Sequence, residues 1–412
     1  MPSTAGERRD FQYFLLISSL IGFSSSLWTT LLPLYLDEAG LKAWEIGFIS
    51  GLMSSLSFML AFTAGVLADV FSWAVALLTS EILQLASIGA LPLARDLALT
   101  SLVAVLYGSS RALVTQAGVR VIVDRSSLRR RGTMYALFLF SEKIARLLGS
   151  YSSGFIVENA GYNSLFQLAA LTLAVSVAVT TGLVLKGEGR SRGTLTRAAE
   201  RFKENVLGTF RAVTRSKELT ALSISIFLHD ASVFIAAPYM LLYVKHVLKL
   251  GEAAAGIISG TKTATSLVFH VFSGWVGDVA GYPAALTTHF ALASLSYAAY
   301  GHTRDFWEAL LVSAFMGFMI TLDLPSRRML AARYAPLDKA SSVAGFIDSV
   351  AGVGAILSPV LGGYLWDINP YLPFITAAAA NLTAIPPMIY LAVRQRKRGK
   401  CIERNCSANL SK

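Results

Sequence analysis

One short pattern occurs in both halves of this apolar chain and limits the folds that it can adopt. The first copy has Gly65 followed four residues later by Asp69, and the second copy has Gly274 and Asp278 at the same spacing. Gly274 lies 209 residues after Gly65, about half of the 412-residue sequence. A repeat of this length in an apolar chain predicts two membrane-embedded halves built on one plan.

Other glycines keep the same spacing along the chain. Further pairs are Gly47 and Gly256, Gly51 and Gly260, Gly108 and Gly317, and Gly154 and Gly363. Chance supplies one or two such pairs but not an ordered series, so the repeat extends over both halves.

The composition excludes an ordinary soluble protein. Hydrophobic residues make up 54% of the chain and charged residues 15%, whereas a soluble domain has about 25% charged residues. A membrane-spanning helix needs about 20 apolar residues. The expected spans are 11–36, 45–68, 74–94, 98–122, 133–157, 163–185, 218–244, 253–277, 283–301, 306–328, 340–366 and 371–393. The sequence therefore predicts an all-α integral membrane protein with 12 transmembrane helices in two pseudo-symmetric six-helix bundles.

These helices divide the chain into four parts. We expect an N-terminal half at residues 1–185, a cytoplasmic linker at 186–217, a C-terminal half at 218–393 and a basic cytoplasmic tail at 394–412. The net charge is +11, and most of the 36 Lys and Arg residues lie in loops and tails on one side of the expected membrane. The positive-inside rule then predicts a multi-pass protein of the cell membrane with both termini cytoplasmic. This distribution explains the basic charge without nucleic acid as a partner.

The sequence predicts neither an enzyme nor a metal site. Cys401 and Cys406 lie in the basic tail, where a reducing cytoplasm disfavours a disulfide and two thiols are too few to hold a metal. No nucleotide-binding loop or hydrolase motif is present, so an ion gradient or the substrate gradient must supply the energy. We expect no cofactor, and a monomer whose partners are a small-molecule substrate, protons and membrane lipids.

The two halves, the long linker and the repeated Gly-x-Leu-Ala-Asp type of motif resemble the major facilitator superfamily. Residues 131–136 and 358–363 are also similar to patterns of that family, and the resemblance covers residues 11–393. It implies alternating access, in which the loop after the second span helps to close an inner gate. We therefore expect gate roles for Gly65, Asp69, Gly274, Asp278, Asp348 and Arg120.

The gate motif departs from the family pattern in one respect. Asp69 and Asp278 lie where each could cap the following helix. The family usually has basic residues soon after this Asp, but residues 70–73 are not basic, so the partner of Asp69 would be Arg120, Arg125 or an arginine of the other half. The match to the family's drug–proton antiporters is incomplete, because Arg111 precedes a Gln and a Gly at wider spacing than theirs.

Ionisable residues inside a membrane span cost free energy and usually face a polar cavity or a charged partner. The resemblance implies a cavity lined by the first two helices of each three-helix unit. The ionisable residues that we single out on those helices are Arg111, Glu142, Lys143, Arg146, His229, Asp230, Lys262, His270, Asp323 and Asp348. The only acidic, basic or histidine residues in the remaining four spans are Glu81 and His289. This partition supports the resemblance.

Asp230 beside His229 is the expected proton site, because a buried carboxyl group next to an imidazole suits proton exchange. The structural alternative is that Asp230 pairs with Lys262. We expect Glu81 to be a partner of arginines near the inner leaflet.

Glu142 and Arg146 lie four residues apart on one helix face and could neutralise each other. Arg111 is open between three roles: a contact for a substrate anion, a partner in the proton site, and a structural partner of Glu142.

The expected function is secondary active transport by rocking of two halves about a central site. The leading hypothesis is proton-coupled export of small amphipathic or drug-like compounds, with Asp230, Glu142 and Arg111 responsible for coupling. One alternative is uptake or exchange of a small organic anion, with positive charge from Arg111, Lys143, Arg146 and Lys262. Another is a non-transporting receptor or lipid-handling protein on the same scaffold.

Overall fold

A computed structural model of the chain describes residues 5–61, 63–64, 72–125, 131–186, 206–336 and 339–395. The regular elements of these described residues are all helices. Gly65 and Asp69, most of the linker and both cysteines lie outside the described residues, so the predictions about them stay predictions.

The helices before residue 186 form one group. They are α1 (Ala5–Glu38), α2 (Ala43–Met59), α4 (Trp73–Ala90), the 3-10 helix η1 (Leu91–Leu93), α5 (Leu97–Arg125) and α6 (Arg131–Leu185). The segment α6 consists of two helices that meet at Gly161, whose φ of 77° lies in the left-handed region that glycine readily adopts.

The helices after residue 216 form a second group. They are α8 (Lys217–Ala236), η3 (Ala237–Tyr239), α9 (Met240–His246), α10 (Glu252–Ala280), α11 (Tyr282–Tyr300), α12 (Phe306–Met319), η4 (Ile320–Leu322), α13 (Asp323–Tyr334), α14 (Ala340–Ile368) and α15 (Leu372–Leu382). Two of the expected spans are therefore continued through a short 3-10 turn, the first from α8 through η3 to α9 and the second from α12 through η4 to α13.

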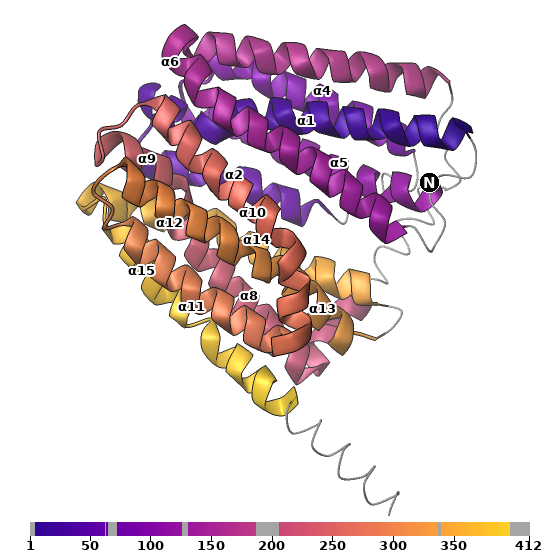
Figure 1. Ribbon diagram of the computed structural model, residues 1–412, viewed down its shortest axis with the longest axis vertical. Coiled ribbons are helices and arrows are strands. Elements are labelled where there is room, and N and C mark those ends of the chain that lie inside the picture. Colours follow the sequence, from indigo (N-terminus) through magenta and orange to yellow (C-terminus); the bar gives the residue numbers. More distant parts are fainter. Residues whose placement is uncertain are drawn as a thin grey trace, which may run out of the picture.

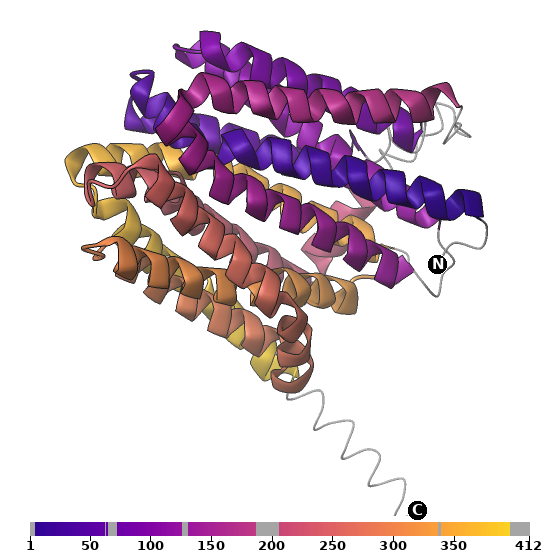
Figure 2. The ribbon, with the colours of Figure 1, turned by 45° about the horizontal axis from the view of Figure 1, so that its top comes forward.

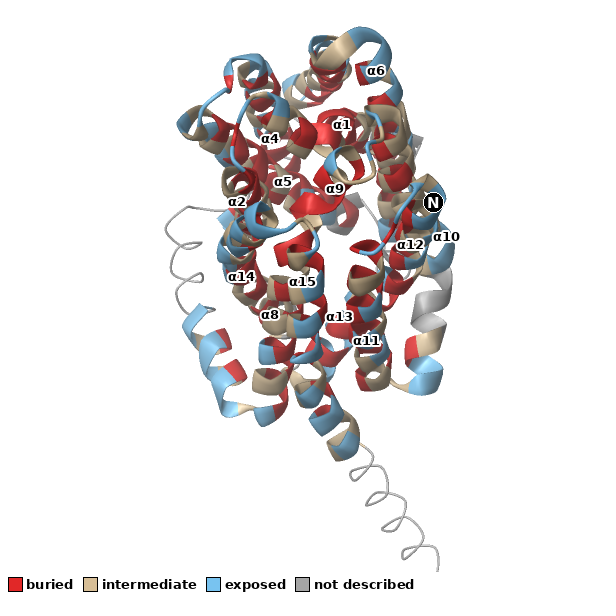
Figure 3. Ribbon diagram, turned by 90° about the vertical axis from the view of Figure 1, so that its left-hand side faces the viewer, coloured by how far each residue is buried: buried red, intermediate tan, exposed pale blue. Residues whose placement is uncertain are grey.

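The outer surface of the helices is suited to lipid. Eight helical segments of the described chain are long and apolar enough to cross a membrane, and one of these, Thr133–Leu185, includes the break at Gly161. Large apolar side chains such as Trp307, Leu311 and Leu357 are 68%, 68% and 71% exposed. Figure 3 shows exposed residues along the outer faces of the helices and buried residues between them. Apolar exposure on this scale is typical of a membrane-embedded surface.

The two groups of helices meet at one end of the molecule and diverge toward the other. In Figures 1 and 2 they converge near α9 and separate toward the end where the N-terminus lies. Two pairs of long helices join the groups, because α2 packs on α14 and α6 packs on α10. We call the end near α9 the closed end, formed by residues 37–47, 239–256 and 359–367, and the opposite end the open end.

The same close contact joins both helix pairs at the closed end. A Cβ atom on Gly363 of α14 would lie 2.2 Å from Trp44 Cα of α2, and one on Gly154 of α6 would lie 2.7 Å from Ala253 Cα of α10. Ala253 follows Trp44, and Gly363 follows Gly154, by the 209 residues of the sequence repeat. Only glycine fits such an approach, so the same backbone contact occurs twice.

A second pair of repeated glycines makes the next contact along each of these helix pairs. A Cβ on Gly47 would lie 2.4 Å from the Pro359 carbonyl oxygen, and a Cβ on Gly256 would lie 3.1 Å from the Ser150 carbonyl oxygen. Pro359 follows Ser150 by the same 209 residues. The sequence repeat is therefore also a repeat of the contacts between helices.

Polar contacts at the closed end also join the two groups. Lys245 Nζ of α9 lies 2.8 Å from Glu38 Oε1 of α1, and His246 Nε2 lies 2.8 Å from Asp37 Oδ2. The Tyr239 hydroxyl of η3 donates to the Ala43 carbonyl oxygen of α2 at 3.2 Å. These contacts lie on the same end as the glycine contacts, so that end is sealed by both packing and polar bonds.

One expectation about the gate motif, that Asp278 caps a helix, is wrong. We expected Asp278 to cap the following helix, but α10 continues through Asp278 to Ala280 and the cap position of α11 is Gly281, which has no side chain. Asp278 instead accepts a hydrogen bond from the Tyr282 hydroxyl. In the first half α4 is capped by Ser72, whose hydroxyl accepts from the Val75 amide at 3.1 Å.

The glycine contact at the closed end predicts that Gly363→Ala destabilises the protein. The added methyl group meets the Trp44 backbone, and overpacking of this kind costs about 1–3 kcal/mol. The matched control is Gly182→Ala, because a Cβ on Gly182 of α6 meets open space and alanine favours a helix. Thermal unfolding in detergent should show a lower midpoint for Gly363→Ala alone. Equal midpoints for the two variants would contradict the close packing.

Candidate functional site

Two neighbouring cavities lie between the two groups of helices. The first has a volume of about 300 Å³, and its lining includes Ser26, Thr29, Arg146, Ser150, Lys262 and Tyr300. The second has a volume of about 380 Å³, and its lining includes Thr29, Pro33, Tyr107, Arg111, Arg146 and Phe234. Thr29, Pro33 and Arg146 line both. Each cavity therefore takes side chains from both halves of the chain, as a site between two moving halves requires.

An ion pair between α5 and α6 borders the second cavity. Arg111 Nη2 donates to Glu142 Oε1 at 3.0 Å, and the two side chains are 20% and 11% exposed. The ion pair of Glu142 is with Arg111 of a neighbouring helix, and the Arg146 charge on its own helix also acts on Glu142. Arg111 is therefore a partner of Glu142, and its other two roles stay predictions.

Two cationic side chains face the first cavity. Arg146 and Lys262 both line it, from α6 and α10. The Arg146 Nη1 atom is buried and has no hydrogen-bond partner among the described residues. Lys143, which we also placed in the cavity region, is not among the residues lining either cavity. The lining of the first cavity is therefore more positive than negative.

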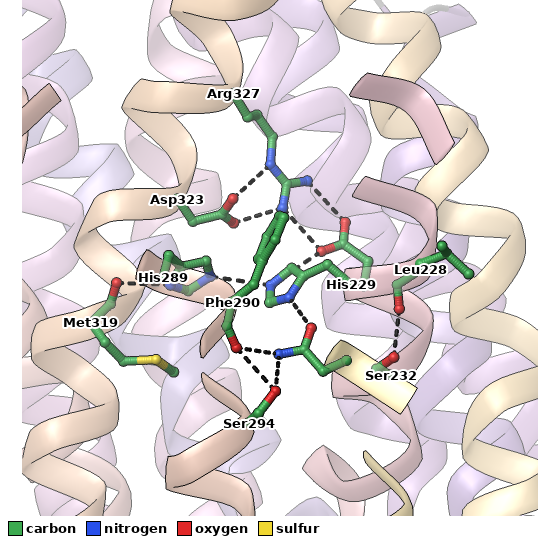
Figure 4. Close-up of polar contacts among 11 residues, drawn as sticks. Leu228, His229, Ser232, His289, Phe290, Ser294, Met319, Asp323 and Arg327 are labelled. Atoms are coloured by element: carbon green, nitrogen blue, oxygen red, sulfur yellow. Dashed lines mark hydrogen bonds and ion pairs between the residues drawn. The ribbon is translucent and has the colours of Figure 1, made fainter. Parts of the chain in front are cut away.

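Asp230 binds an arginine that the sequence analysis did not single out. Arg327 of α13 donates from Nη1 to Asp230 Oδ2 at 2.9 Å and from Nη2 to Asp230 Oδ1 at 3.0 Å. It also donates from Nε to Asp323 Oδ1 at 3.0 Å and from Nη2 to Asp323 Oδ2 at 2.6 Å. The expectation that Asp230 pairs with Lys262 is therefore wrong. Arg327 holds two carboxylates in bidentate contacts, the strongest geometry for such a pair (Figure 4).

His229 and His289 lie beside this ion cluster. Their Nε2 atoms are 3.1 Å apart, and His229 Nε2 lies 3.9 Å from Asp230 Oδ1. His229 Nδ1 lies 2.7 Å from Asn381 Oδ1, and His289 Nδ1 lies 2.9 Å from the Met319 carbonyl oxygen. Figure 4 shows both imidazole rings directed toward each other below Arg327. Four helical segments of the second half thus converge on one buried polar cluster.

The sequence contains a signal for the partner of Arg327 but none for the partner of His289. Arg327 follows Asp323 by four residues on one helix, a spacing that places an acid and a base side by side. His289 is the only histidine or charged residue of its expected span, but nothing in its local sequence indicates that it faces His229.

Other candidate residues have different environments from those we expected. Glu81 is 1% exposed and accepts hydrogen bonds from Ser176 at 2.5 Å and Thr180 at 3.0 Å, so the expectation of arginine partners is wrong. Asp348 of α14 forms an ion pair with Arg328 of α13.

The remaining gate candidates have positions but no tested role. Arg120 lies in α5 and Gly274 lies in α10, while Gly65 and Asp69 lie outside the described residues. Their gate roles stay predictions.

Long apolar helices, two halves related by a repeat, and a charged cavity between them define a helical transporter of the membrane. The sequence matches the family model of the Major Facilitator Superfamily in two consecutive stretches, residues 13–221 and 222–405. The chain belongs to the major facilitator superfamily of transporters.

Two curated relatives and one solved structure are similar to this chain. Multidrug resistance protein MdtG of Klebsiella pneumoniae (strain 342) is 27% identical over 169 residues, which cover 39% of this chain and 40% of that protein. Quinolone resistance protein NorA of Staphylococcus aureus is 22% identical over 176 residues, covering 43% of this chain and 45% of NorA. The chain thus matches less than half the length of each relative. A crystal structure of a mutant peptide transporter POT in complex with alafosfalin has a TM-score of 0.76 at 14% identity, covers 94% of both chains, and shows the same fold.

The Arg327 cluster predicts a large loss of stability when Arg327, which binds both of its carboxylates, is replaced. Arg327→Met leaves two buried carboxylates facing each other, and breaking a buried pair costs about 3–5 kcal/mol. The triple variant Arg327→Met, Asp230→Asn and Asp323→Asn should recover much of this loss, because no charge remains unpaired.

Arg328→Met is the matched control for this experiment. The Arg328 side chain is 44% exposed, against 9% for Arg327, so its removal should cost far less. Unfolding of the purified variants in detergent measures the difference. Similar losses for Arg327→Met and Arg328→Met would contradict a stabilising ion cluster.

Proposed function

We propose that this protein is a twelve-helix secondary transporter that exports small amphipathic or drug-like compounds in exchange for protons. The halves would be residues 1–185 and 218–393, joined by the linker at 186–217 and followed by the tail at 394–412. The proposal rests on the pair of cavities between the halves. Arg111, Arg146 and Lys262 are among the residues that line them. A secondary transporter needs a central site of this kind that opens to one side at a time.

The relatives support export as the direction of transport. MdtG is named a multidrug resistance protein and NorA a quinolone resistance protein. Resistance by transport requires removal of a compound from the cell, and aromatic side chains such as Tyr107 and Phe234 in the second cavity suit an apolar or aromatic molecule.

The ion pairs supply groups for proton coupling. Protonation of Glu142 would weaken its bond to Arg111, and protonation of Asp230 would weaken one side of the Arg327 cluster. In either case the loss of a charged contact between helices can bias the arrangement of those helices. We assign coupling to Asp230, Glu142 and Arg111, and closure of the inner gate to Asp69, Asp278 and Asp348 with Arg120.

The proposed orientation places both termini in the cytoplasm of a cell-membrane protein. The positive-inside pattern of the loops supports it. The open end, where the N-terminus lies, would then face the cytoplasm, and the structure would be the inward-facing state.

A second candidate substrate is a small organic anion, which would be taken up or exchanged. Arg146 and Lys262 both line the first cavity, and an Arg146 nitrogen there has no protein partner among the described residues. A carboxylate or similar group on a substrate would neutralise this positive charge.

Proton flux in reconstituted vesicles tests the leading proposal. The protein is placed in vesicles that contain a pH-sensitive dye, and pools of cationic, neutral and anionic compounds are added. The wild type should give a substrate-dependent pH change, and Asp230→Asn should abolish it because the substituted side chain cannot exchange a proton.

The control for this assay is Asp305→Asn. Asp305 caps α12 through its side chain, and asparagine caps equally well, so this variant should retain the pH change. Transport that proceeds without a pH change, and equally in Asp230→Asn, would contradict proton coupling and favour the anion.

A further inference from the structure

Two buried histidines from separate helices face each other through the same ring atom. His229 of α8 and His289 of α11 are 3% and 1% exposed, and their Nε2 atoms lie 3.1 Å apart. That distance is a hydrogen-bond distance, so one of the two nitrogens must hold a hydrogen atom. The protonation of the pair follows from the groups on the other side of each ring.

The protonation of His229 Nδ1 is fixed by Asn381. The Asn381 amide nitrogen lies 2.8 Å from the Phe290 carbonyl oxygen and 3.1 Å from Ser294 Oγ. A carbonyl oxygen only accepts hydrogen bonds, so the amide NH₂ group must face Phe290 and the amide oxygen must face His229. His229 Nδ1, 2.7 Å from that oxygen, therefore bears a hydrogen and donates it.

The protonation of His289 Nδ1 is fixed in the same way. It lies 2.9 Å from the Met319 carbonyl oxygen, which can only accept, so His289 Nδ1 also bears a hydrogen. A neutral imidazole has a hydrogen on one nitrogen and a lone pair on the other. If both rings were neutral, two lone pairs would face each other across the 3.1 Å contact between His229 and His289.

We propose that His229 and His289 bind one proton between their Nε2 atoms, which makes the pair a buried proton-binding site. The shared proton converts the repulsive contact into an N–H···N hydrogen bond. It also balances the charge of the cluster, because two aspartates and Arg327 leave one net negative charge beside the rings. An unbalanced charge in a buried site costs free energy, so the cluster favours the proton.

The surrounding groups are consistent with a single added positive charge. Phe290 stacks on the His229 ring with centroids 4.5 Å apart, a position in which an aromatic face stabilises a cation. Tyr297 of α11 is near enough to Asp230 for the negative charge of that carboxylate to act on its hydroxyl group. The ion pair of Asp348 with Arg328, between α14 and α13, adds no net charge.

A divalent cation fits this cluster less well than a proton. His229, His289 and Asp323 offer atoms that lie within 4.8 Å of one another. However, both carboxylate oxygens of Asp323 already accept hydrogen bonds from Arg327. A doubly charged ion would also leave the cluster with a net positive charge, whereas one proton makes it neutral.

Nitrogen magnetic resonance of the full-length protein in lipid nanodiscs tests the proposal. The chain has five histidines, all labelled with ¹⁵N, and the measurement is the scalar coupling between two ring nitrogens through a shared hydrogen. The wild type at neutral pH should show one such coupling, which disappears as the pH is raised. His289→Gln should abolish it, and His302→Gln, at an exposed loop position, should leave it intact.

Asp323→Asn is a second test that does not alter either ring. Removing one negative charge should lower the pH at which the coupling disappears by about one pH unit or more. An absent coupling in the wild type, with both Nε2 atoms free of hydrogen, would overturn the proposal. Histidine signals that change on addition of a chelator would also overturn it, in favour of a metal ion.

A role for this proton in transport depends on the function proposed above. The magnetic resonance measurement needs no substrate, so a failure of the vesicle assay would remove the proposed function and leave the proton site standing. Conversely, an absent coupling in a protein that still moves protons would remove this site alone.

Discussion

The architecture depends on glycine contacts that bring helices of the two halves together at the closed end. Gly363 against Trp44 and Gly154 against Ala253 are the same contact at positions 209 residues apart. In a membrane, association of helices relies on close packing because lipid provides no hydrophobic driving force between them. Small residues at these points therefore hold the halves together, and the side chains further along the same helices surround the cavities.

The charges of the interior are arranged so that each buried carboxylate in the cavity region has a cationic partner. Arg111 neutralises Glu142, and Arg327 binds both Asp230 and Asp323. Because a buried unpaired charge is costly, each of these pairs is a stable arrangement that protonation of one member would weaken. The cavity lining differs, since Arg146 and Lys262 face open volume there. Arg111 does both, because it joins α5 to α6 through Glu142 and also lines the second cavity.

The sequence predicts the repeat, the apolar helices and the family well, because these depend on spacing and composition. It does not single out one partner for each charged residue, because several of the partners come from helices far apart in the chain. Asp230 and Arg327 are 97 residues apart, and Arg111 and Glu142 are 31 apart. For Glu142 the sequence offered two cations, Arg146 on the same helix face and Arg111 on another helix, and the ion pair forms with Arg111. The cap assigned to Asp278 failed for a local reason, since α10 continues past it.

The central claim is that the closed end must open for a substrate to cross. The most direct test replaces Glu38 and Lys245, which form the ion pair between α1 and α9, with cysteines in a chain that also has Cys401→Ser and Cys406→Ser. A short, reducible thiol crosslinker then joins the two halves in vesicles, and substrate counterflow is measured before and after reduction. The account predicts that crosslinking stops counterflow, that reduction restores it, and that either single-cysteine variant is unaffected. Counterflow that continues with the closed end covalently joined would contradict alternating access by these two halves.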